Sequence, residues 1–191
     1  MKSISLCMLS LCGAVLTAGV AHAGPVNNGG FETGDFTGWV LFGDDAFTGV
    51  GSGVQHSGAN GAFFGAFTPG GISQTLSTVA GASYEVSFWL MNADDGAPNA
   101  FEFNWNGGAA ELSLNDAPAT AYQQYAFTLT ASAATTELSF TFSHATAFYY
   151  LDDVLVSTSA TGTVPEPNSL ALVAVSLAGL GAAARRKHRV L

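Results

Sequence analysis

The chain has 191 residues, of which 48% are hydrophobic and 10% are charged, and this composition excludes an acidic disordered protein and a coiled coil. Five Lys and Arg residues stand against 14 Asp and Glu residues, so the formal net charge is -9. Such a balance excludes nucleic acid as a partner, because phosphate contacts need clustered cations. The length suits a single domain once removable ends are subtracted.

The first 23 residues have the features of a secretory signal peptide. An apolar stretch follows Lys2 and ends in the A-x-A cleavage sequence Ala21-His22-Ala23. Cys7 and Cys12 fall within this segment, so the exported protein is expected to have no thiol and no disulfide. We predict that residues 1–23 direct export and are then removed.

Residues 24–157 are predicted to form the folded domain. Their apolar residues alternate with polar ones over 84–90, 101–105, 125–129 and 138–142. Turn-forming sequences separate these runs, and Asn106-Gly107 is a strong hairpin signal because both residues tolerate a positive φ. Short antiparallel strands with one apolar face pack as two sheets. We therefore predict an all-β fold, an antiparallel β-sandwich of the jelly-roll type.

Charge is distributed unevenly, because no Lys or Arg occurs between residues 24 and 164 whereas thirteen of the carboxylates do. A buried carboxylate in the domain therefore has no Lys or Arg to pair with. It must be protonated, hydrogen-bonded to backbone N–H groups or bound to a metal ion.

Three segments follow the predicted sandwich. Residues 158–168 form a linker that contains Pro165-Glu166-Pro167, residues 169–184 are uncharged and apolar, and residues 185–191 are basic. A helix over the apolar segment would span about 24 Å, and the positive-inside rule would keep the basic tail in the cytoplasm. We predict a C-terminal transmembrane helix that holds the sandwich outside the inner membrane.

A Pro-Glu-Pro sequence followed by a short apolar helix and a basic end resembles the PEP-CTERM sorting signal of Gram-negative bacteria. The resemblance implies that a membrane exosortase recognises the sorting motif Pro165, Glu166 and Pro167 and cuts near it. The protein would be anchored in the inner membrane transiently, then released to the cell surface or the extracellular matrix of a biofilm. The alternative is an ordinary tail anchor.

Four stretches, taken in chain order, resemble the galactose-binding-like jelly roll of carbohydrate-binding modules of families 4, 9 and 22. They are residues 28–32 with Gly38-Trp39, residues 71–76, residues 81–89 and residues 149–154. The resemblance covers most of residues 27–156 and implies a module that binds or organises extracellular polysaccharide. The alternative is a structural or adhesive matrix protein that has protein partners and no sugar ligand.

In that family a structural calcium ion commonly joins the first strand to the last. The resemblance implies Glu32 and Asp152 as its ligands, with Asp153 as the alternative to Asp152. The residues are consistent with this, because two adjacent carboxylates within an apolar strand point to opposite faces and one is then partly buried. Ca²⁺ prefers carboxylate and carbonyl oxygens. A carboxylate that caps a turn or faces solvent is the alternative.

A sugar site needs aromatic rings that stack on pyranose faces, with polar neighbours for the hydroxyl groups. Trp89 and Tyr122 fall on the polar sides of their strands, and Glu102 and Asn104 would supply polar contacts beside them. These four are the predicted ligand-binding residues. The alternative for Trp89 is packing beneath a loop, and Trp39 is predicted to belong to the core.

Catalysis is not expected. Glycoside hydrolysis needs two carboxylates about 5–10 Å apart, and Glu85 and Glu102 could supply them from neighbouring strands, but thirteen carboxylates make such a pair easy to find by chance. His56 and His144 accompany no catalytic or metal-binding motif, so we expect surface or hydrogen-bonding roles for them. We predict a protein that is not an enzyme and has no catalytic residues.

Overall fold

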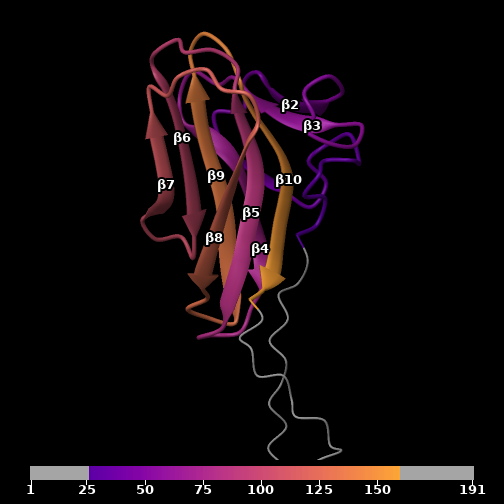
Figure 1. Cartoon of the computed structure of the whole chain (residues 1–191), viewed down its shortest axis with the longest axis vertical. Helices are drawn as coiled ribbons and strands as arrows, with labels where there is room; N and C mark the ends of the chain where they lie inside the picture. The colour runs from indigo at the N-terminus through magenta and orange to yellow at the C-terminus, as the bar shows by residue number, and fades with distance from the viewer. Residues whose placement is uncertain (1–25, 160–191) are drawn as a thin grey trace, which may run out of the picture.

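The computed structural model describes residues 26–159, which form two five-stranded antiparallel sheets packed face to face (Figure 1). Sheet A has the strand order β1-β4-β9-β6-β7, and sheet B has the order β2-β3-β10-β5-β8. The predicted antiparallel β-sandwich is confirmed. The strands are β1 Val40–Gly43, β2 Thr48–Gly51, β3 Gly61–Phe64, β4 Gly70–Ser77, β5 Ser83–Asn92, β6 Asn99–Trp105, β7 Ala110–Asn115, β8 Gln123–Thr130, β9 Thr135–His144 and β10 Tyr149–Thr158.

Several predictions concern residues outside this range. The signal peptide, the sorting motif, the transmembrane helix at 169–184 and the basic tail all lie outside the described residues. β10 extends to Thr158, one residue beyond the predicted end of the domain. Within residues 26–159, no helix has the length and apolarity needed to cross a membrane.

The alternation of apolar residues places the core between the two sheets. The inward-facing apolar residues of β5 are all buried there: Tyr84, Val86, Phe88 and Leu90. The Phe88 ring meets the rings of Phe103 and Phe140 from sheet A, with centroids 5.2 and 5.1 Å apart. Trp39 is also buried, as predicted. Aromatic rings from both sheets therefore form one continuous core.

The loops determine the two ends of the sandwich. β9 runs toward the end at which β10 begins, and β10 runs back to the end at which the described chain stops (Figure 1). The loops β1–β2, β3–β4, β5–β6, β7–β8 and β9–β10 lie at the opposite end, which we call the distal end. The Asn106-Gly107 turn lies at the other end, and its predicted positive φ angles are confirmed at 68° and 66°.

Candidate functional site

The outer face of sheet A carries an open hollow of about 360 Å³. Its walls come from four strands, β1, β4, β6 and β9, and from the β6–β7 turn. The sheet order therefore brings together residues that are distant in sequence. The lining residues are Phe42, Ser73, Asn104, Gly107, Gly108, Glu137, Ser139 and Thr141.

Phe42 gives the hollow an aromatic wall. It lies on edge strand β1, is 37% exposed and pairs with Gly71 of β4. A β-carbon placed on Gly71 would overlap the Phe140 carbonyl oxygen of β9 and would lie 3.1 Å from Phe42 Cζ, so glycine allows both the neighbouring strand and the ring to approach. Sequence analysis missed this ring, because four apolar residues ending in glycine show no alternation.

Most of the polar groups opposite Phe42 make no hydrogen bond within the described residues. No hydrogen bond among the described residues involves the hydroxyl groups of Ser73, Ser139 and Thr141, which all line the hollow. Asn104 Nδ2 donates to the Gly108 carbonyl at 3.0 Å, which fixes the amide and leaves its oxygen available. The hollow thus combines an aromatic face with free hydroxyl and amide groups.

The four predicted ligand-binding residues are divided between the two sheets. Asn104 lines the hollow, and Glu102, on the same outward side of β6, pairs with Thr141. Trp89 belongs to β5, and Tyr122 directly precedes β8, so both lie on the sheet B side. The prediction that Glu102 and Asn104 lie beside Trp89 and Tyr122 is therefore wrong. The alternation of polar and apolar residues shows which side chains point away from the core, but it does not show to which of the two sheets a strand belongs.

Trp89 faces outward from sheet B and is covered by the β2–β3 loop. The His56 ring stacks on the indole, with centroids 3.8 Å apart and 13° between the planes. Tyr122 meets His56 edge to face at 5.3 Å and donates its hydroxyl to the Val54 carbonyl. Burial, followed by the charge of Asp152, raises the pKa of the Tyr122 hydroxyl. These rings are already used to hold the loop.

Asp152 lies fully buried beneath the same loop. Its Oδ2 accepts the backbone N–H groups of His56 and Ser57 at 2.8 and 3.0 Å, and its Oδ1 accepts the N–H of Asp153 at 2.7 Å. Burial raises the pKa of the Asp152 carboxyl, while the N–H groups of Ser57, Asp153 and His56 oppose that rise. These backbone N–H donors therefore satisfy the buried carboxylate in place of a Lys or Arg side chain.

Asp153 is the next residue of β10 and occupies a bulge. Its φ is 50°, in the left-handed region, and the register with β5 shifts between Asp152 and Leu155. Asp153 Oδ2 lies 2.7 Å from His56 Nδ1, and Asp153 Oδ1 accepts the Ser57 hydroxyl at 2.8 Å. The bulge therefore turns two successive carboxylates toward one loop.

Glu32 contacts the same β2–β3 loop from the other side. Its Oε1 accepts the N–H groups of Ala59 and Asn60 at 3.0 and 3.1 Å. Each of the three predicted calcium ligands therefore bonds the segment between Val54 and Gly61. Glu32 and the Asp pair therefore contact one loop, and their predicted role as calcium ligands stays a prediction.

Two carboxylate oxygens border the space above Gly30. A β-carbon placed on Gly30 would lie 3.8 Å from Asp153 Oδ1 and 3.9 Å from Asp152 Oδ1, so both oxygens border a space that glycine leaves open. Each accepts one hydrogen bond and keeps a lone pair. Within residues 26–159, no group of three or more His, Cys, Asp or Glu side chains is placed to hold a metal. Backbone carbonyls and water would have to complete the coordination.

The two carboxylates of the candidate catalytic pair lie on different sheets. Glu85 lies on β5 of sheet B and Glu102 on β6 of sheet A, so this candidate pair does not face each other across neighbouring strands. His144 is buried, with Nε2 3.0 Å from Asn92 Oδ1 and Nδ1 accepting the N–H of Ala147 at 3.0 Å. Its predicted hydrogen-bonding role is confirmed.

In a comparison of the sequence with protein families, the model of the PEP-CTERM protein-sorting motif matches residues 163–187. The chain carries a PEP-CTERM sorting motif. Such a motif implies an exported protein that an exosortase sorts, and it lies beyond the residues that the structure describes. No curated protein sequence matches this PEP-CTERM chain.

Solved structures share the fold of the sandwich. TmCBM61, solved with β-1,4-galactotriose, has a TM-score of 0.52 and 20% identity over 69% of this chain and 96% of its own. The CBM22-1 xylan-binding domain of Paenibacillus barcinonensis Xyn10C has a TM-score of 0.51 and 18% identity, over 73% and 92%. The K3 cleaved adhesin domain of Lys-gingipain from Porphyromonas gingivalis has a TM-score of 0.51 and 17% identity, over 71% and 98%. The predicted resemblance to carbohydrate-binding modules is confirmed for the fold.

Proposed function

We propose that this chain is an exported, exosortase-sorted and non-catalytic protein that binds extracellular polysaccharide through the hollow on sheet A. The observation that carries the proposal is the Phe42 ring opposite three hydroxyl groups that have no hydrogen bond among the described residues and the Asn104 amide, whose oxygen is available. An aromatic face stacks on the apolar face of a sugar ring, and the polar groups bind its hydroxyls. The similarity of fold to xylan- and galactan-related modules supports this function.

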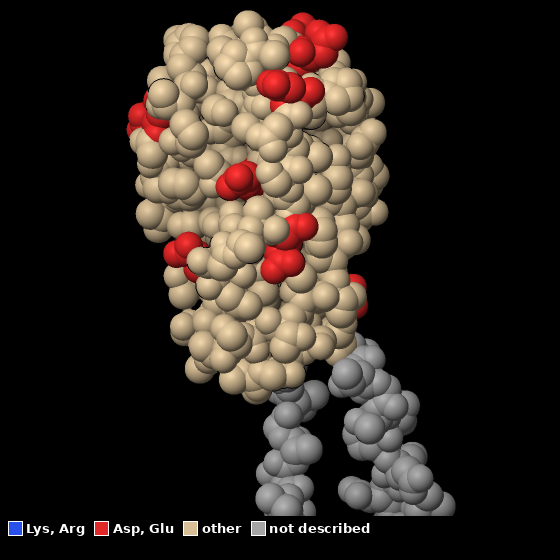
Figure 2. All heavy atoms as spheres, turned by 90° about the vertical axis from the view of Figure 1, so that its left-hand side faces the viewer, with Lys and Arg blue, Asp and Glu red and all other residues tan. Residues whose placement is uncertain are grey.

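The charge of the domain selects the ligand class. The described residues include no Lys or Arg, and Figure 2 shows carboxylates scattered over the face in view. Glu137 lines the hollow itself. A uronate would be repelled, because nothing cationic stands near it, so we infer a neutral polysaccharide.

The double variant Phe42→Ala, Asn104→Ala is expected to bind neutral xylan or galactan at least about tenfold more weakly, which corresponds to about 1.4 kcal/mol. The change removes the ring and the oriented amide and leaves the core untouched. Affinity gel electrophoresis of the exported protein, residues 24–191, measures the effect. Tyr122→Phe is the control, because it removes one hydroxyl on sheet B and is expected to leave binding unchanged. Unchanged binding in the double variant would contradict the proposal.

A protein partner is the second candidate, and the edge of sheet A favours it. Val40 is 64% exposed, and β1 carries no charge on its unpaired edge. A partner could add a strand there. Val40→Lys would block strand addition without replacing a residue that lines the hollow, so loss of matrix retention with unchanged sugar binding would favour this candidate.

We also propose a structural calcium ion beside Gly30, held by Asp152 and Asp153 with Glu32 in support. EDTA is then expected to lower the melting temperature of the protein, and calcium to restore it. Gly30→Ala should keep the fold, because its β-carbon makes only ordinary contacts, but should lose the calcium response by filling the space. Glu32→Ala is expected to lose the response as well.

This calcium effect should depend on pH. Because burial raises the pKa of Asp152, the calcium-free fold holds that proton more tightly than the unfolded chain does. The resulting stabilisation is present at low pH and is lost as pH rises through the raised pKa. Calcium competes with the proton, so its effect on the melting temperature should grow over the same pH window. A melt at neutral pH that is indifferent to both calcium and EDTA would contradict the site.

A further inference from the structure

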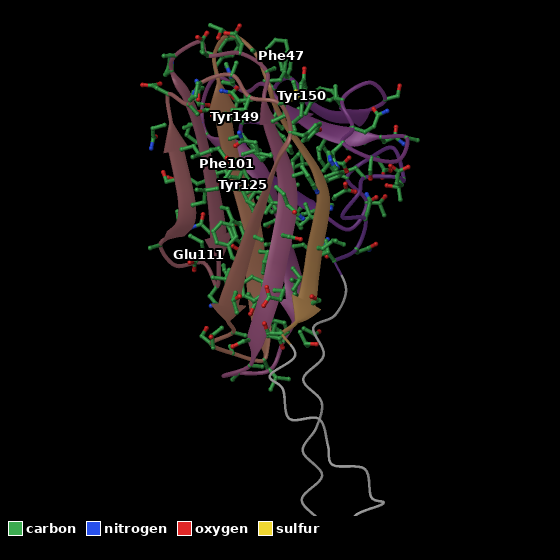
Figure 3. The ribbon with its side chains drawn as sticks, viewed as in Figure 1. Phe47, Phe101, Glu111, Tyr125, Tyr149 and Tyr150 are labelled. Carbon is green, nitrogen blue, oxygen red and sulfur yellow. The ribbon has the colours of Figure 1, made fainter. Side chains whose placement is uncertain are left out.

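Two phenylalanine rings stand exposed at the distal end. Phe47, in the β1–β2 loop, and Phe67, in the β3–β4 loop, are each 60% exposed, and their rings meet edge to face with centroids 5.7 Å apart. Figure 3 shows Phe47 at the end of the sandwich opposite the point where β10 stops. A hollow of about 160 Å³ adjoins the rings and is lined further by Gly65 and residues 144–148. We call this set the distal aromatic corner.

Asp44 fixes both loops of the distal aromatic corner. Its Oδ1 accepts the N–H of Ala46 at 3.0 Å, and its Oδ2 accepts the N–H and hydroxyl of Thr68 at 3.2 and 2.9 Å. These bonds, the Ala46 N–H first, hold the pKa of Asp44 below its usual range. Gly65 N–H also donates to the Phe47 carbonyl at 3.1 Å. The two rings are thus presented by a hydrogen-bonded framework.

Phe47 combines two unfavourable features. Its φ of 54° lies in the left-handed region, which is strained for a residue with a β-carbon. Its ring remains mostly exposed to water, so burial of the ring does not offset the backbone strain. Strained residues that the surrounding structure holds in place cluster at functional sites.

We propose that the distal aromatic corner is a second carbohydrate site, which takes the terminal residue of a neutral polysaccharide chain; this inference rests on the proposed function. The rings stand at 84° to each other, so they enclose a small ligand on two sides. The hollow beside them is less than half the volume of the one on sheet A. Thr146 lines it and supplies a hydroxyl for hydrogen bonding.

Charge decides against other occupants of the corner. Asp44 and Asp45 lie in the same loop as Phe47. A β-carbon on Gly96 would overlap Thr146 Oγ1 and lie 2.9 Å from Asp94 Oδ1, so a carboxylate also lies near Thr146. Carboxylates without a Lys or Arg in the described residues repel an anionic glycan and an anionic bilayer. They also repel the same end of a second copy.

The position of the corner gives the domain two separate binding surfaces. The hollow lies on the outer face of sheet A, whereas the corner lies at the distal end. One domain could therefore hold two polysaccharide chains, or one chain at two points with higher avidity. The proposed function is thereby extended from binding to cross-linking of neutral polysaccharide.

The test compares the exported wild-type protein with three variants. One double variant carries Phe47→Ala and Phe67→Ala, the other carries Phe42→Ala and Asn104→Ala, and the quadruple variant carries all four changes. Affinity electrophoresis and turbidity with neutral xylan or galactan are the readouts. We expect each double variant to bind at least tenfold more weakly and to lose turbidity, and the quadruple variant not to bind. Leu155→Ala, which truncates another exposed apolar residue, on β10, is the matched control.

The outcomes separate the two proposals. If the Phe42, Asn104 variant loses all binding while the Phe47, Phe67 variant equals the wild type, the corner is overturned and the proposed function stands. If the Phe42, Asn104 variant keeps full binding and the Phe47, Phe67 variant loses it, the corner is supported and the sheet A hollow is wrong. Absence of wild-type binding, or binding to phosphatidylcholine vesicles in place of polysaccharide, overturns the corner as a sugar site.

The variant Phe47→Gly separates a loss of binding from a loss of folding. Glycine adopts a positive φ without strain, so this variant should melt at a higher or equal temperature. It nevertheless lacks the ring, so its polysaccharide turbidity should be lost. A more stable variant that still forms the turbid complex would overturn the corner.

Discussion

Asp152→Ala is expected to lower the free energy of unfolding by about 1–3 kcal/mol, a substantial part of the 5–15 kcal/mol typical of a domain. The substitution leaves the N–H groups of His56, Ser57 and Asp153 without their acceptor, and an unmade hydrogen bond at a buried group costs about 1–3 kcal/mol. Urea unfolding in EDTA measures the change without a calcium contribution.

Two further variants make the Asp152 experiment specific. Asp152→Asn retains one oxygen acceptor and the side-chain volume, so its loss should fall between that of alanine and the wild type. Glu111→Ala removes an exposed carboxylate from edge strand β7 and is expected to change stability by less than about 0.5 kcal/mol. A loss of less than about 1 kcal/mol for Asp152→Ala would show that the loop does not depend on this carboxylate.

The sequence predicts the parts of the sandwich that local pattern controls. Alternation identifies β5, β6, β8 and β9, because each has one face toward the core, and Asn106-Gly107 marks a hairpin through its own backbone preferences. It does not reveal β1, β2 and β3, which have four residues each and all contain glycine. Short strands of this kind are set by pairing with a distant neighbour.

The candidate sites were less predictable, because they depend on which sheet each strand joins. Asn104 and Trp89 both point outward, yet they lie on opposite faces of the sandwich, and no local pattern carries that information. Phe42 reaches the hollow only because β1 pairs with β4 beside β9. The stacking of His56 on Trp89 likewise depends on a loop folding over sheet B.

Charge composition predicted the problem at Asp152 but left its solution open. The absence of Lys and Arg meant that a buried carboxylate needed a metal, a proton or backbone donors. The structure supplies backbone donors from residues 95 and 96 positions away in the sequence. Such a partner cannot be read from composition, because any loop has free N–H groups and only the fold decides which loop is near.

Gly29→Ala is expected to lower the free energy of unfolding by about 3 kcal/mol or more. A β-carbon on Gly29 would overlap the Val154 carbonyl oxygen, which is backbone and cannot rotate away. The same approach carries the 2.9 Å hydrogen bond from Val154 N–H to the Gly29 carbonyl, which ties the opening segment to β10 beside the Asp pair. Urea unfolding in EDTA provides the measurement.

The neighbouring glycine is the control for this last variant. A β-carbon on Gly30 would come no closer than 3.8 Å to any atom outside its chain neighbours, which is ordinary van der Waals contact. Gly30→Ala should therefore change the stability in EDTA by less than about 0.5 kcal/mol. Equal losses at both positions would mean that alanine is harmful to this segment for a general reason. The contrast between the two glycines would then not reflect the close approach of the opening segment to β10.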